Sequence, residues 1–222
     1  PAVLTRVAAL GFADRIEADP ARAVQGADCV MLCAPVGAYA AIAAAIAPHL
    51  APGAILTDVG STKVSVIRDV APLLPAGVHF VPAHPLSELW RRMGAMVECM
   101  DPAHHDRVVA VVSHLPHLIA FTICGTADDL AIEGGEDASR AEVLKFAASG
   151  FRDFTRIAAS NPVMWRDIFL NNQTALLEML DRFTLDAAQM AAAIRNGDGA
   201  YIEEQVERGR KIRRALIEAN QA

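Results

Sequence analysis

The sequence predicts an α/β domain built on a parallel sheet, followed by an all-helical domain, and three observations carry this prediction. Within the first hundred residues, short apolar runs alternate with helical runs. The apolar runs lack the polar alternation of a strand that has one face in water, which is typical of a parallel sheet covered by helices. From Asp101 onward only helical periods follow. We therefore expect one domain over residues 1–100 and a second over residues 101–222.

Prolines and glycines divide the N-terminal half into its elements. The expected order is a strand at 28–34, a helix at 37–50, a strand at 54–58, a helix at 61–74 and a strand at 79–83. Ser61 stands where the second helix is expected to begin and is a candidate N-cap. Asp58, Ser61 and His84 all lie where strands end, and open α/β sheets bind their ligands at that edge.

The helical half contains two clear helix starts and one uncharged helix. Asp101-Pro102 and Asn161-Pro162 each place proline at the first helical position after an N-cap residue. The run at 108–127 carries no charged residue and is long enough to span a membrane, but its histidines and proline are costly in lipid. We interpret it as a core helix, covered by a second copy of the chain. The expected helices lie at 103–128, 139–149, 151–160, 162–183, 185–196 and 199–219.

The composition excludes several classes of function. The net charge is -6 and aromatic residues make up 5% of the chain, so no nucleic-acid or anionic-membrane partner is expected. The cysteines lie in apolar runs without metal-binding spacing, which favours buried, reduced thiols and a cytoplasmic location. These cysteines are Cys29, Cys33, Cys99 and Cys124. No signal peptide is expected, because the first residues lack a basic segment followed by an apolar one.

Two groups at the predicted sheet edge are candidates for chemistry. Residues 57–63 form a strand-to-helix turn in which Gly60 allows close backbone approach, although an ordinary capped turn has the same pattern. His84 follows the third predicted strand. A histidine there is a candidate general base, because its ordinary pKa lies near neutrality, and the alternative is a loop histidine with satisfied hydrogen bonds.

Two further groups lie on predicted helices. His114 and His117 share one helix face, without the glutamate of the zinc motif, so no metal is expected; they line a pocket or meet buried partners. Pro116 between them is expected to kink the helix. Arg152 and Arg156 share another face and suit a small dicarboxylate, the alternative for Arg156 being a surface ion pair with Asp153.

Taken in order, these motifs resemble the prephenate/arogenate dehydrogenase family of tyrosine biosynthesis. The segments that carry the resemblance are Ala34-Pro-Val36, Asp58-Val-Gly-Ser-Thr-Lys63, Ala83-His-Pro85, Ser113-His-Leu-Pro-His117, Gly150-Phe-Arg-Asp-Phe-Thr-Arg-Ile157 and Met164-Trp-Arg-Asp-Ile168. The resemblance implies a Rossmann domain followed by a helical domain that forms a homodimer. It also implies oxidative decarboxylation of prephenate or arogenate, with hydride transfer to NAD or NADP.

The resemblance also implies roles for single residues. His84 would accept the hydrogen bond of the substrate's ring hydroxyl and act as base, and Ser61 would hold that hydroxyl and His84 in register. Arg156, supplemented by Arg152, would bind a substrate carboxylate. His114 and His117 would line the pocket. The residues at the cofactor would be Ala34, Pro35, Val36, Asp58 and Gly60.

The chain departs from the family pattern in two places. The family begins with a strand, a G-x-G-x-x-G turn and a ribose-binding acid, none of which occurs here. The family also continues from His-Pro through a loop and a further strand, whereas here Leu86 leads directly to Ser87. We therefore expect family segments to be missing before Pro1 and at the 86–87 junction.

Two alternative functions remain open on the sequence. One is a different dehydrogenase with a Rossmann half and a helical half, such as a β-hydroxyacid dehydrogenase or a pyrroline-carboxylate reductase. The first of these is expected to use a catalytic lysine, and the helical half contains only Lys145 and Lys211. The other alternative is a non-catalytic dimerising remnant, which the missing glycine-rich turn favours and the retained His84 and Arg156 oppose.

Overall fold

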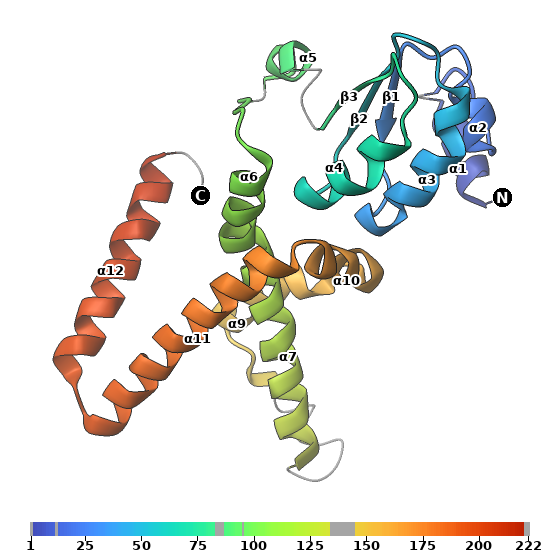
Figure 1. Cartoon of the computed structure of the whole chain (residues 1–222). Coiled ribbons are helices and arrows are strands. Elements are labelled where there is room, and N and C mark those ends of the chain that lie inside the picture. Colours follow the sequence, from blue (N-terminus) through green and yellow to red (C-terminus); the bar gives the residue numbers. More distant parts are fainter. Residues whose placement is uncertain (1, 12, 83–86, 95, 134–144, 220–222) are drawn as a thin grey trace. The chain divides into compact units, whose positions relative to one another are not determined.

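The computed structural model describes residues 2–11, 13–82, 87–94, 96–133 and 145–219 (Figure 1). It divides into two compact units, residues 1–176 and residues 177–222. The predicted domain boundary near residue 100 falls inside the first unit. Among the described residues, the last strand ends at Val81 and every later regular element is helical.

The first unit contains the predicted parallel sheet. Its strands are β1 (Cys29–Leu32), β2 (Ile55–Asp58) and β3 (His79–Val81), in the order β1-β2-β3. Leu32 pairs with Asp58 and Leu56 with Phe80, so the carboxyl ends of neighbouring strands lie together. The sheet, visible in Figure 1, confirms the predicted α/β class, with strands that are shorter than expected.

Helices connect the strands and enclose a core with the sheet. The elements between strands are η1 (Val36–Ala38), α3 (Tyr39–Ile46), η2 (Ala47–His49), α4 (Val64–Val70) and η3 (Ala71–Leu73). Leu56 of the central strand is fully buried against side chains of α3 and α4. Trp165 and Ile168 of α10 (Pro162–Asn171) join the same core. Two helices, α1 (Ala2–Leu10) and α2 (Pro20–Ala23), precede the sheet and were not predicted.

The helical part follows the predicted caps more closely than the predicted helix lengths. Asp101 accepts hydrogen bonds from the N–H groups of Ala103 and His104, and Asn161 accepts one from Met164, so both predicted caps are confirmed. The elements are α5 (Ser87–Arg92), α6 (Pro102–Val109), a π-helical turn η4 (Ala110–His114), α7 (Leu115–Glu133), α9 (Ser149–Thr155), a 3-10 turn η5 (Arg156–Ala159), α10, α11 (Gln173–Asn196) and α12 (Gly199–Glu218).

Three helix boundaries differ from the sequence prediction. The predicted helix at 103–128 contains the π turn just before Pro116, where a kink was expected. The predicted helix at 162–183 is wrong, because Asn172 leaves the helical conformation and α11 then runs unbroken to Asn196. The predicted helix at 139–149 lies largely outside the described residues.

In the second unit, α12 is tied to the end of α11. Asp198 accepts a hydrogen bond from the Tyr201 N–H and caps α12. The Tyr201 hydroxyl lies 3.2 Å from Oε1 of Gln189 on α11. A short connection therefore joins two long helices through a cap and one side-chain contact.

One prediction about burial is wrong, and a second stays a prediction. Cys29, Cys33 and Cys99 are exposed and Cys124 is half-buried, so the prediction of four buried thiols is wrong. Cys29 and Cys33 lie on and just after β1, an edge strand of the described sheet, where an apolar run does not imply cover. Residues 102–129 are apolar and long enough to cross a membrane, and only 17% of their most apolar window is buried. Little of this helix is buried within the single chain, and its expected cover by a second copy stays a prediction.

The start of α4 also differs from its prediction. The helix begins at Val64, and Ser61 is exposed in the turn before it, so Ser61 is not its N-cap. Instead, Asp106 of α6 accepts hydrogen bonds from the N–H groups of Lys63 (2.7 Å) and Val64 (2.9 Å). A carboxylate from a distant helix therefore satisfies donors that a local cap usually takes.

A buried ion pair holds the turn between β2 and α4. The Lys63 ammonium lies 2.6 Å from Oδ2 of Asp58 and donates to the Gly60 carbonyl, and the Gly60 N–H donates to the same carboxylate. The Lys63 and Asp58 side chains are 7% and 0% exposed. A Cβ atom at Gly60 would lie 2.8 Å from Cγ1 of Val36 and 2.9 Å from the carboxylate, so only glycine fits.

We expect Lys63→Met to destabilise the protein by about 3–5 kcal/mol, because it leaves the Asp58 carboxylate buried without its counter-charge. Urea denaturation measures the loss. Arg68→Met is the matched control, since it breaks the exposed Arg68–Asp69 pair and is expected to cost about 1 kcal/mol or less. Equal losses for the two variants would contradict the structural importance of the buried pair.

Candidate functional site

The residues predicted at the cofactor gather at the carboxyl ends of β1 and β2. Ala34 and Pro35 follow β1, half-buried and exposed, and Val36 is buried beside Gly60. The Val59 N–H donates to the carbonyl of Leu32, which ties the two strand ends together. The structure thus brings the predicted residues of both strand ends to one edge of the sheet, where small or apolar groups face the surroundings.

The Asp58 carboxylate is paired with Lys63 inside this edge of the sheet. Its side chain is fully buried, and Oδ2 accepts from Lys63 and Gly60. Burial, together with the negative charge of Asp58, raises the pKa of the nearby Tyr39 hydroxyl, which donates to the Leu32 carbonyl. Asp58 therefore holds the turn from inside, and Val59 and Ser61 are the exposed residues that the turn presents.

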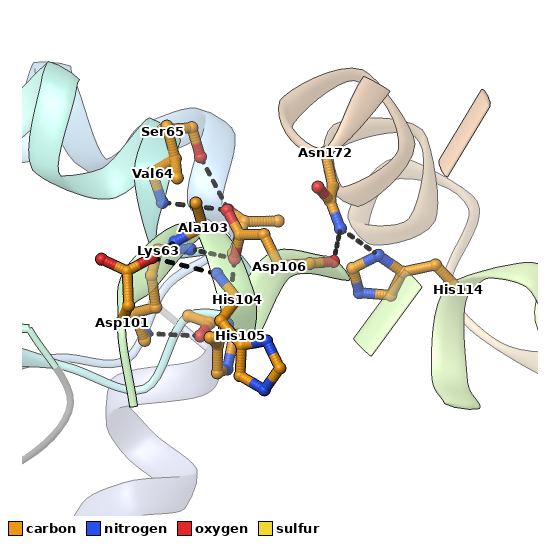
Figure 2. A network of polar contacts seen from close by, with 12 residues as sticks. Lys63, Val64, Ser65, Asp101, Ala103, His104, His105, Asp106, His114 and Asn172 are labelled. Atoms are coloured by element: carbon orange, nitrogen blue, oxygen red, sulfur yellow. Dashed lines mark hydrogen bonds and ion pairs between the residues drawn. The ribbon is translucent and has the colours of Figure 1, made fainter. Parts of the chain in front are cut away.

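Asp106 connects this turn to the helical part (Figure 2). Its carboxylate accepts hydrogen bonds from the backbone of Lys63 and Val64 and from Nδ1 of His105, 2.9 Å away. Burial by itself would raise the pKa of Asp106, but the bonds from His105, Val64 and Lys63 outweigh it and lower the pKa. The group therefore stays a carboxylate at neutral pH.

Asp106 is linked to His114 through the side chain of Asn172. The Asn172 side-chain amide donates to the backbone carbonyl of Asp106 at 2.8 Å and lies 3.0 Å from Nδ1 of His114. Because the amide nitrogen is a donor, Nδ1 must accept, and the ring proton sits on Nε2. Burial lowers the pKa of His114 to about 4, so the ring is neutral at pH 7. Its Nε2 is buried and has no hydrogen-bond partner among the described residues.

His117 lies beside His114 on an aromatic cluster. Its ring stacks on Trp165 with centroids 3.8 Å apart, and the His114 ring meets the same indole edge-on at 6.1 Å. Phe121 and Phe169 complete the cluster. His117 Nδ1 lies 2.9 Å from the Ser113 carbonyl, so it donates there and leaves Nε2 for another partner. The two predicted pocket histidines are thus brought together around Trp165.

The two predicted arginines lie on the segment that packs along α7. Arg152 is on α9, and Arg156 begins the 3-10 turn η5. The sequence had suggested that both arginines share one face of a helix. The structure places them on two successive helical segments. Both side chains are exposed, and neither forms an ion pair with any described residue; the alternative Asp153–Arg156 pair is likewise not formed between these described side chains.

His84 lies outside the described residues, so its relation to Ser61 stays a prediction. Asp106, Asn172 and Trp165 occupy central places that the sequence prediction did not assign. Trp165 belongs to the motif at 164–168, for which the sequence predicted no role. Asp106 and Asn172 carry no local signal, because their partners are 42 to 66 residues away in the chain.

Comparison with known families matches both halves of the chain. Residues 3–88 match the family described as prephenate dehydrogenase, nucleotide-binding domain. Residues 101–208 match the family described as prephenate dehydrogenase, dimerization domain. Together the two matches span most of the 222 residues.

Individual relatives agree with these matches. The cyclohexadienyl dehydrogenase of Zymomonas mobilis is 36% identical over 251 residues, which cover 96% of this chain and 84% of the relative. The prephenate dehydrogenase of Lactococcus lactis is 30% identical, with 88% of this chain and 62% of the relative covered. Because the first alignment is longer than this chain of 222 residues, that relative contains residues without a counterpart here.

Solved structures share the fold. The prephenate dehydrogenase of Aquifex aeolicus, in complex with hydroxyphenyl propionate and NAD+, has a TM-score of 0.82 and 29% identity, with 98% of this chain and 86% of the other covered. The arogenate dehydrogenase of Synechocystis, at 22% identity and a TM-score of 0.71, has the same fold, with 97% of this chain and 88% of the other covered. The family matches and the close relative agree: this chain belongs to the prephenate dehydrogenase family.

Proposed function

We propose that the protein oxidatively decarboxylates prephenate or arogenate, giving 4-hydroxyphenylpyruvate or tyrosine, and passes a hydride to NAD or NADP. The observation that carries this proposal is the link from the strand-end turn holding Ser61, through Asp106 and Asn172, to the buried His114 with the half-buried His117 beside it. Family membership supports it, because the Aquifex relative binds a hydroxyphenyl compound and NAD+ in the same fold. Family membership also argues against a β-hydroxyacid dehydrogenase.

The strand ends fit a dinucleotide cofactor. Ala34, Pro35 and Val59 are uncharged, Ala34 is half-buried and the other two are exposed, which suits the approach of a flat ring to the edge of the sheet. Gly60 keeps the turn close to Val36. Asp58 contributes by holding that turn from inside. When bound, the cofactor supplies the hydride acceptor, and the residues of this chain orient the substrate and move its proton.

The substrate proposal rests on charge and hydrogen-bonding capacity. Arg156 and Arg152 are exposed cations without an ion pair to any described residue, so they are available for carboxylates. His114 offers a neutral N–H donor and His117 an acceptor beside the Trp165 ring. Ser61 holds the ring hydroxyl, and His84 takes its proton.

The reaction balances with one hydride and one carbon dioxide leaving the substrate. The ring carbon that bears the hydroxyl gives up its hydride while His84 receives the hydroxyl proton. The carbon–carbon bond to the ring carboxylate breaks, carbon dioxide leaves, and the bonding electrons complete an aromatic ring, whose oxygen takes the proton back from His84. Aromatisation supplies the driving force, so the protein's main task is to align Ser61, His84 and the carboxylate-binding arginines.

We also propose that the protein is a homodimer in the cytoplasm, with no membrane, nucleic-acid or metal partner. The apolar helix at 102–129 has little cover within the chain, and a monomer rarely leaves so large an apolar surface in water. A second copy of the same helical part is the partner that the match to a dimerization domain favours.

The purified protein, mixed with prephenate or arogenate and with NAD or NADP, is expected to form reduced nicotinamide, which absorbance measures. His84→Asn is expected to lose turnover by about 10²–10⁴-fold while cofactor affinity is retained, because it removes a base and keeps a polar group. Absence of reduced cofactor in all four mixtures would favour the non-catalytic alternative. A normal pH profile for His84→Asn would shift the assignment to His117 or His114.

Arg156→Lys is expected to raise the substrate KM about tenfold or more, corresponding to about 1.4 kcal/mol, because an ammonium cannot reproduce the paired hydrogen bonds of a guanidinium. Arg156→Gln is expected to raise KM further, and Arg152→Gln less. KM and Tm are measured on the same variants. A lowered Tm with an unchanged KM would return Arg156 to a purely structural role.

Sedimentation at micromolar concentration is expected to show a dimer, and Val112→Glu is expected to dissociate it, because Val112 is an exposed apolar residue of the uncovered helix. Leu10→Glu is the matched control, since Leu10 is exposed to a similar extent on α1. A monomeric wild-type protein, or equal dissociation by both variants, would contradict this interface.

A further inference from the structure

We propose that Asp106 is a positioning residue that sets the place of Ser61 relative to His114, and that it does so through the first backbone amides of α4. This inference rests on the proposed function, because Ser61 matters for turnover only if the turn serves a reacting substrate. Asp106 itself is 4% exposed and does not have to touch the substrate.

Helix α4 has no local side-chain cap. Lys63 precedes the helix and makes no side-chain cap hydrogen bond, and Ser61 is exposed in the turn. Both amides that begin the helix donate to Asp106, one to each carboxylate oxygen. Lys63 also anchors the other side of the turn through its ammonium group and Asp58. The short segment that carries Ser61 is therefore fixed between two carboxylates.

Asp106 is also connected to His114, through Asn172 (Figure 2). The backbone carbonyl of Asp106 accepts from Asn172, which is 5% exposed and also contacts Nδ1 of His114. One residue thus touches the turn through its side chain and the Asn172–His114 pair through its backbone. A shift of α6 would move Ser61 and His114 relative to each other.

No other side chain of the same size can accept all of the hydrogen bonds that the Asp106 carboxylate accepts. Its two oxygens accept three hydrogen bonds, from Lys63, Val64 and His105. An asparagine keeps one oxygen and places an NH₂ group against a donor N–H. The amide must then rotate or the turn must move, and small displacements of reacting groups are costly for catalysis.

The experiment compares Asp106→Asn with Asp101→Asn. Asp101 is the N-cap of α6 and also accepts two backbone N–H groups, but both of them belong to its own helix. We expect Asp106→Asn to lower kcat about tenfold or more with substrate KM within about threefold, measured well below each variant's Tm. Asp101→Asn is expected to leave kcat unchanged and Tm nearly so, because asparagine caps a helix about as well as aspartate. If Asp106→Asn does not fold, Asp106→Glu keeps the charge and displaces it by one methylene, with the same loss expected.

A double-mutant cycle tests whether the effect passes through Ser61. In a Ser61→Ala background, Asp106→Asn is expected to add no further loss of kcat, because the hydroxyl that it positions is gone. Fully additive losses, or a change of Tm alone, would overturn the inference.

Amide hydrogen exchange of residues 60–64 gives a readout without substrate. Exchange is expected to rise in Asp106→Asn or Asp106→Glu and to stay unchanged in Asp101→Asn. Unchanged exchange in the Asp106 variants would overturn the positioning role even in a protein without turnover. A wild-type protein without turnover but with the expected exchange would count against the proposed function and support the role of Asp106 in placing the turn.

Discussion

The amino terminus of α4 leaves backbone donors that its own sequence does not satisfy, and this constraint organises the site. A helix start needs acceptors for its first amides. Here the acceptor is a buried carboxylate on α6, 43 residues further along the chain from Lys63. On the other side, the Lys63 ammonium is committed to Asp58 at the end of β2. The sheet, the turn and the helical part are therefore joined at one short segment, which carries Ser61 and is linked through Asp106 and Asn172 to His114.

Features with a local cause could be predicted from the sequence. The three strands follow from continuous apolar runs, and the caps at Asp101 and Asn161 follow from an acceptor side chain before proline. The start of α4 could not be predicted in this way. Ser61 has the chemistry of a cap, but the turn between Asp58 and Lys63 holds it outside the helix, and the acceptor that takes its place comes from α6. The break at Asn172 is hidden for the same reason, since Asp106 and His114 are its partners.

Local spacing in the sequence predicted which site residues form pairs. It did not predict the distant residues that hold these pairs in place. His114 and His117 were expected on one face, and both meet Trp165. The identity of Asn172 as the group that fixes the His114 tautomer depends on a contact across 58 residues, which no pattern in one sequence reports. The prediction of buried cysteines was wrong for a different reason. Hydrophobic neighbours at Cys29 and Cys33 indicated burial, but an edge strand can be apolar and still be exposed.

The π turn at Ala110–His114 makes chain length matter as well as side-chain identity in this stretch. The N–H of Leu115 reaches back five residues to Ala110, so the turn accommodates one residue more than an α-helical turn does. Removing one residue would restore an α-helical turn and rotate everything downstream by about 100° around the helix axis. His117 and Phe121 would then leave Trp165, although no residue in contact had been replaced. Shortening this segment by one residue would therefore dismantle the aromatic cluster even with every contacting side chain kept.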